Sequence, residues 1–262
     1  MIDSAELAGK VAGLLAIIQG KRLAALKKLT LTVLLNKNPY LYQSHGHSRP
    51  EDFVDAVLAA RISSSDETIF GKDFFEPLAL WAAGAAQIPG RAVSVSDAAG
   101  ADVTISDATS HYAIAVKSGT KIFNSQSSVG QKSEFEANQA RMKKLGKVFL
   151  PLIGYSYGRK KHNVKALIDK MAGQAFWKLL TDEDTFYLRI SESISACASQ
   201  HKIVFDQSLE IKRSALVKEF IIDFTEASGQ IDWRRVVQFN SAAEKPRKKR
   251  ITKAKPKTIP IQ

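Results

Sequence analysis

Two short alternating runs of residues stand close together in the middle of the chain, and they constrain the fold more than any other feature. They are residues 101–105 and 112–117. Every second residue of the later run is aromatic or branched aliphatic, and the alternate positions hold two alanines and then Lys117. This two-residue period is typical of β-strands. The Ser-Asp-Ala-Thr-Ser segment between the runs favours a tight turn, so together they predict a β-hairpin.

The hairpin carries one carboxylate and one amine that can meet at the same point of the sheet. Asp102 stands on the first predicted strand, and Lys117 ends the second. Metal-assisted phosphodiester hydrolysis requires a carboxylate for a divalent cation and a positive charge beside the attacked phosphate. An exposed Asp and Lys on an edge hairpin would have the same spacing, so the pattern alone leaves both interpretations open.

Further segments stand in order around Asp102 and Lys117: a serine-rich acidic segment, the end of the lysine strand with Asn-Ser after it, an apolar run, and a Gly-x-x-Phe-Trp segment. They are residues 63–71 leading into Glu76, residues 116–119 and 124–126, residues 148–153, and residues 173–177. This ordered set resembles the PD-(D/E)xK type II restriction endonucleases, most closely the PmeII-like group, from about residue 38 to residue 190.

The resemblance implies an α/β fold with a mixed central sheet of about four or five strands flanked by helices, as in restriction endonucleases, with helical N- and C-terminal additions. It implies a type II site-specific deoxyribonuclease that hydrolyses phosphodiester bonds of double-stranded DNA with Mg²⁺, as part of restriction–modification. A homodimer is expected, because palindromic DNA sites match two-fold protein symmetry.

One position departs from the superfamily pattern. The pattern places Asp or Glu two residues before the lysine, and here that residue is Ala115. Alanine cannot bind a metal, so a second acidic ligand must come from elsewhere, or the site is damaged. Glu76 is the favoured catalytic and metal-binding candidate beside Asp102, and Glu67 is the alternative. Either glutamate could instead be an ordinary charge on a solvated helix, since Ser65 is a candidate helix cap just before them.

Polar and basic residues near the predicted hairpin are candidates for DNA contact. Asn and Gln side chains suit adenine, and Lys and Arg suit phosphates. Candidates for base contact are Asn124, Ser125 and Gln126, and candidates for phosphate contact are Lys121, Arg159 and Lys160. Plain surface polarity would explain the same residues, so these assignments are expectations.

Composition narrows the class of protein. The chain of 262 residues has one cysteine, Cys197, which excludes an internal disulfide and a cysteine-based metal site. We expect a cytoplasmic protein without membrane association, because the start lacks a basic signal region and no apolar run reaches the about 20 residues of a membrane helix.

Eight of the basic residues lie in residues 245–262, and removing them from the net charge of +12 leaves +4. With three prolines and no acid in that stretch, the composition predicts a disordered basic tail over residues 241–262.

The apolar spacing predicts one restriction-endonuclease-like domain over residues 1–240. Within it, the spacing predicts a helical hairpin over residues 1–36, with a break at Gly20, and a helical addition over residues 163–240. Strands are expected at about 91–95, 101–106, 111–118 and 147–154. A helix is expected at about 129–145.

Three functions fit these residues. The first is a sequence-specific, Mg²⁺-dependent endonuclease. The second, motivated by Ala115, is a catalytically weak or inactive DNA-binding protein of the same fold. The third is a non-specific nuclease. The first is the expected function, and the other two are its alternatives; the sequence separates the first two poorly.

Overall fold

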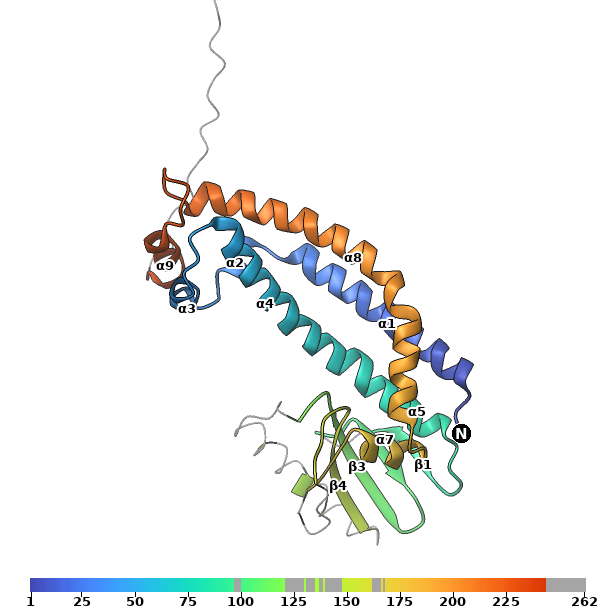
Figure 1. Ribbon diagram of the computed structural model, residues 1–262. Coiled ribbons are helices and arrows are strands. Elements are labelled where there is room, and N and C mark those ends of the chain that lie inside the picture. The colour runs from blue at the N-terminus through green and yellow to red at the C-terminus, as the bar shows by residue number, and fades with distance from the viewer. Residues whose placement is uncertain are drawn as a thin grey trace, which may run out of the picture. The chain divides into compact units, whose positions relative to one another are not determined.

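The computed structural model describes residues 1–96, 100–120, 130, 135–136, 139, 148–161, 166 and 168–243, and its chain forms two compact units (Figure 1). Unit 1 comprises residues 1–25 and 63–207, and unit 2 comprises residues 26–62 and 208–262. The expectation that residues 1–240 fold as a single domain stays a prediction. Most of the helix expected at 129–145, and the tail from residue 244 onward, lie outside the described residues. Among the described helices, none is long and apolar enough to span a bilayer.

Unit 1 contains a five-stranded mixed sheet in the order β1-β2-β3-β4-β5. The first three strands are antiparallel neighbours, and β4 and β5 continue the sheet in parallel. The strands are β1 (Ala92–Val95), β2 (Val103–Ser106), β3 (Ser110–Lys117), β4 (Val148–Tyr155) and β5 (Asp169–Ala172). The expected hairpin is β2–β3, with Val103 opposite Ile114. The mixed sheet flanked by helices confirms the predicted fold class.

The alternation along β3 places its side chains in two different cores. Ile114 and Val116 are buried with residues of the flanking helices, whereas Ala113 and Ala115 are buried on the other face with Phe149 and other residues. The helices that share the first core are α1 (Ser4–Lys28), α5 (Glu76–Ala85), α7 (Gln174–Thr181) and the start of α8 (Phe186–Phe224). Both faces of the middle of this strand are therefore buried, whereas Ser110 and Lys117 at its two ends are only partly buried.

Helix α1 corrects one expectation. It runs without a break from Ser4 to Lys28, so residues 1–36 do not form a helical hairpin. A glycine within a helix costs only about 1 kcal/mol relative to alanine, and tertiary contacts on both sides of Gly20 outweigh that cost. Gln19 donates a hydrogen bond to the carbonyl of His201, and Arg22 pairs with Asp66 at 2.8 Å.

Helix α4 (Pro50–Phe70) corrects a second expectation, because Ser65 lies within it and caps no helix. The helix continues as a π-helical turn, η1 (Gly71–Phe75), and Pro77 then stands in the first turn of α5, where a proline is tolerated. Gly71 allows close approach to β3: a Cβ there would lie 2.7 Å from the Ser118 hydroxyl oxygen. This contact brings the start of α5 to the end of β3.

Unit 2 is helical. It holds α2 (Leu31–Leu34), α3 (Pro39–Ser44) and α9 (Trp233–Ser241), together with parts of α4 and α8. Phe53, Val57 and Phe220 are buried in its core, and Arg213 forms a bidentate pair with Asp55 at 2.6 and 2.8 Å.

The expected helical addition at 163–240 is helical only from α7 onward, because β5 precedes it. A four-residue strand is too short to show a period, so β5 has no recognisable strand pattern in the sequence.

Candidate active site

Asp102 and Lys117 meet at one end of the β2–β3 hairpin. The Lys117 Nζ lies 3.6 Å from the Asp102 Oδ2, and the two side chains are 26% and 29% exposed. Backbone contacts hold the carboxylate in place: the Val116 N–H donates to Asp102 Oδ2 at 2.7 Å, and the Asp102 N–H donates to the Ile114 carbonyl at 2.8 Å. The structure therefore brings together the carboxylate and the amine that the hairpin pattern singled out.

Glu76 adds a second carboxylate to this pair. It is the first residue of α5 and is partly buried. Burial, followed by the negative charge of Asp102, raises the pKa of Glu76 from 4.5 to about 7, although Lys117 and Lys72 act in the opposite direction. Glu76 thus lies within electrostatic reach of both Asp102 and Lys117. A carboxylate whose ionisation is disfavoured by burial and by a second carboxylate, next to a lysine, forms an arrangement that a cation would relieve.

Ala115 leaves no acidic group at the usual position of the superfamily pattern. It is fully buried, with Phe149, Ile153 and Tyr155 in the same apolar core. A carboxylate in such surroundings would lose much of its hydration. The second acidic group of this end of the sheet is therefore the glutamate that arrives from α5.

Glu67 lies on α4 and faces a different space. Together with Asp66, Phe70 and Phe75 it lines a cavity of about 240 Å³, which Ser118 and Tyr157 complete. Glu67 is not among the charges that perturb Glu76, whereas Asp102, Lys117, Lys72 and Asp73 are. Of the two alternatives, Glu76 is the one that the structure places with Asp102 and Lys117.

Metal-ligating side chains are few at this site. Within the described ranges there is no group of three or more His, Cys, Asp or Glu residues that could hold a metal ion. Glu76 and Asp102 are a set of two carboxylates, which suits a cation that keeps much of its hydration. Mg²⁺ is such a cation, since it prefers oxygen ligands and binds through one or two carboxylates plus waters.

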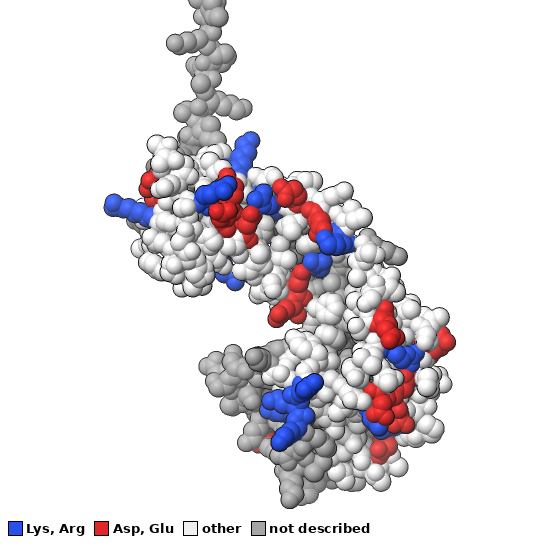
Figure 2. Space-filling model, viewed as in Figure 1, with Lys and Arg blue, Asp and Glu red and all other residues white. Residues whose placement is uncertain are grey.

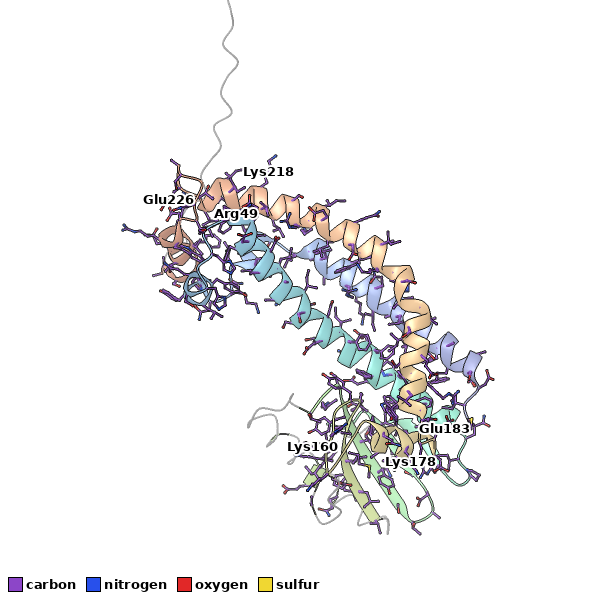
Figure 3. The ribbon with its side chains drawn as sticks, in the orientation of Figure 1. Arg49, Lys160, Lys178, Glu183, Lys218 and Glu226 are labelled. Atoms are coloured by element: carbon purple, nitrogen blue, oxygen red, sulfur yellow. The ribbon has the colours of Figure 1, made fainter. Side chains whose placement is uncertain are left out.

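The candidates for DNA contact fall into two groups. Lys121, Asn124, Ser125 and Gln126 lie outside the described residues. Arg159 and Lys160 are exposed on the segment that follows β4. That segment runs beside the end of β3, because the Ser156 N–H donates to the Lys117 carbonyl at 2.8 Å and the Tyr157 N–H donates to the Ser118 carbonyl at 3.1 Å. Figure 2 shows basic side chains gathered on unit 1, in the region where Figure 3 labels Lys160.

Two charged residues next to Glu76 were not among the predicted site residues. Lys72 and Asp73 belong to η1, and both influence the pKa of Glu76. Asp73 also pairs with Lys21 of α1 at 2.6 Å. Lys72 stands four residues before Glu76, a spacing that brings side chains together on a helix and is visible in the sequence. The pairing of Asp73 with Lys21 has no such signal, because the two residues are far apart in the chain.

A comparison with known protein families determines the class of the protein. A family model described as type II restriction endonuclease EcoO109I matches residues 6–202, which is most of the chain and includes Glu76, Asp102 and Lys117. No curated protein matches the chain. The family match confirms the resemblance at the level of type II restriction endonuclease. The chain belongs to the EcoO109I family of type II restriction endonucleases.

Proposed function

We propose that this protein is a Mg²⁺-dependent endonuclease that cleaves double-stranded DNA at a specific sequence, with Asp102, Glu76 and Lys117 as its catalytic residues. The observation that carries the proposal is the geometry at the end of the hairpin: the Lys117 Nζ lies 3.6 Å from Asp102 Oδ2, and Glu76 lies close enough to both residues for their charges to shift its pKa. Such a concentration of perturbed charge is typical of a functional site.

Asp102 and Glu76 would hold the metal. Mg²⁺ prefers oxygen ligands, and both residues supply them. Without a cation, the two neighbouring carboxylates would repel each other. When bound, Mg²⁺ would lower the pKa of a coordinated water and offset the negative charge of the phosphoryl oxygens. The hydrogen bond from the Val116 N–H fixes the orientation of Asp102, so this carboxylate does not need to reorganise.

Lys117 would act on the scissile phosphate. Its ammonium group already lies 3.6 Å from Asp102 Oδ2, so it stands beside the metal-binding carboxylate rather than apart from it. Two roles fit this position: orientation or deprotonation of the attacking water, and stabilisation of negative charge in the transition state. Lys117→Arg tests whether deprotonation is required, because arginine keeps the charge and can still orient the water but cannot act as a base.

Three finer features belong to the same proposal. The PmeII-like grouping rests on the ordered sequence segments. A homodimer rests on the symmetry of palindromic sites. Contacts of Arg159 and Lys160 with DNA phosphates rest on their exposure beside the end of β3.

A plasmid digest tests the proposal. Wild-type protein with Mg²⁺ should give discrete fragments, and EDTA should abolish them. A smear would indicate a non-specific nuclease. Absence of any cleavage, with DNA binding retained, would support the inactive protein that Ala115 suggests. Glu76→Gln then decides the residue assignment, because it should lose nearly as much activity as Asp102→Asn, whereas Glu67→Gln should lose less.

A further inference from the structure

A second cavity of unit 1, about 600 Å³ in volume, begins where β4, the strand next to β3, ends. Ser156 lines it and follows β4 directly, and β4 pairs in parallel with β3 so that Tyr155 stands opposite Lys117. The Ser156 N–H donates to the Lys117 carbonyl. A backbone hydrogen bond therefore connects a lining residue of the cavity directly to the candidate catalytic lysine.

The Ser156 side chain is polar, buried and unpaired. Its residue is 5% exposed, and its hydroxyl has no hydrogen-bond partner in the part of the chain that the structure describes. The main chain of Ser156 is satisfied, because its carbonyl accepts a hydrogen bond from the Trp177 indole N–H at 2.9 Å. A buried hydroxyl without a partner is costly, so a ligand that accepts its hydrogen bond would recover that cost.

The start of α7 faces the same cavity. Gly173, Gln174 and Ala175 all line it, and no described side chain caps this helix end. The first N–H groups of a helix have no partner within the helix, and the helix dipole favours an anion there. Gly173 permits tight packing of this end, because a Cβ on it would lie 2.9 Å from the Gly158 carbonyl oxygen.

The charge of the lining has one sign. Arg159 and Lys160 line the cavity, and none of its described lining residues is acidic. Neither of these two basic residues forms an ion pair with any other described residue, and both are exposed. By contrast, Lys178 near the other end of α7 is paired with Asp184 at 3.0 Å. Figure 3 labels both Lys160 and Lys178.

We propose that this cavity binds a backbone phosphate of the DNA substrate, next to the scissile phosphate at Lys117. The Ser156 hydroxyl and the first N–H groups of α7 donate to the phosphate oxygens, and Arg159 and Lys160 supply the positive charge. The site orients the DNA strand relative to Asp102 and Lys117 and reads no base. This inference rests on the proposed function, since it takes DNA as the ligand.

The test combines two measurements on the full chain. The first is the melting temperature with and without inorganic phosphate, which probes the cavity in the absence of DNA. The second is the affinity for duplex DNA in EDTA over a range of salt concentrations. The variants are Ser156→Ala, Arg159→Ala and Lys160→Ala, with Lys178→Ala as the matched charge control and Ser193→Ala, whose hydroxyl bonds the Arg189 carbonyl, as the serine control.

Phosphate should raise the melting temperature of the wild type and of the two controls, and it should raise that of Ser156→Ala and Arg159→Ala less. Without phosphate, Ser156→Ala should melt at or above the wild-type temperature, because the substitution removes no hydrogen bond within the protein. Its DNA affinity should fall about tenfold, as expected for a hydrogen bond to a charged group. Arg159→Ala and Lys160→Ala should each lower the log–log salt slope by about 0.9.

The failure of this inference differs from the failure of the proposed function. If Ser156→Ala and Arg159→Ala bind DNA as tightly as the wild type, with unchanged salt slopes, the phosphate site is refuted even when Mg²⁺-dependent cleavage is normal. If the wild type cleaves nothing but binds DNA about tenfold more tightly than Ser156→Ala, the phosphate site stands and the nuclease assignment fails.

Discussion

Replacing Glu76 with glutamine should stabilise the protein while it removes activity. In the folded chain the pKa of Glu76 is raised from 4.5 to about 7, first by burial and then by Asp102. The folded state therefore binds the Glu76 proton more tightly than the unfolded state does. The resulting stabilisation is fully present below the ordinary pKa of 4.5 and is lost as pH rises through about 7. Glutamine carries no charge at any pH, so the variant avoids that loss.

The size of the effect follows from the same values. One pKa unit corresponds to ~1.36 kcal/mol, so the difference between 4.5 and about 7 sets an upper bound of ~3.4 kcal/mol on the change in the free energy of unfolding. Glu76 is partly exposed, and screening by solvent reduces the bound to roughly 1–2 kcal/mol. At this chain length, 1 kcal/mol changes the melting temperature by about 2–4 °C.

Thermal melting in EDTA at pH 5 and at pH 8.5 measures this effect. Glu76→Gln should melt about 2–8 °C above the wild type at pH 8.5, and the difference should shrink at pH 5. Glu67→Gln controls for the removal of a carboxylate elsewhere, and its melting temperature should not follow this pattern. Equal melting temperatures of Glu76→Gln and wild type at pH 8.5 would refute the reasoning. The ionised Glu76 carboxylate, buried beside Asp102, would then not lower the stability of the folded protein.

Three other predictions concern the site and the tail. Lys117→Ala should abolish cleavage and leave DNA binding largely intact; cleavage within a few-fold of the wild type, measured on plasmid, would contradict the assignment. Asp102→Asn keeps an oxygen for the Val116 N–H but loses the charge that attracts Mg²⁺, so it should lose metal-dependent activity at ordinary Mg²⁺ concentration. Deleting residues 245–262 should lower the log–log salt slope of DNA binding by about 0.9 for each phosphate that the tail neutralises in the wild type, without moving the cleavage position; an unchanged slope would place the tail away from the DNA.

The hairpin that carries Asp102 and Lys117 was predictable from the sequence by itself. A strand has a side-chain period of two, so the alternation around Ile114 determined which residues are buried on each face. The turn between the strands then determined the register, which pairs Val103 with Ile114 and so places Asp102 close to Val116 near the end of β3. Local geometry of this kind needs no information from the rest of the chain. The ordered segments around it were sufficient for the class of type II restriction endonucleases, which the family match over residues 6–202 confirms.

Tertiary structure alone decided everything that depends on residues far apart in the chain. The sequence favoured Glu76 over Glu67 but could not show which of them reaches Asp102, and the close approach of Gly71 to Ser118 places the start of α5 at the end of β3. The unbroken course of α1 through Gly20 depends on contacts with His201 and Asp66. The burial of the Ser156 hydroxyl without a partner is visible only in the folded chain, where Trp177 of α7 packs against the end of β4. Burial and Coulomb interactions act through space, so a linear pattern can name the residues for a site but cannot set the distances between them.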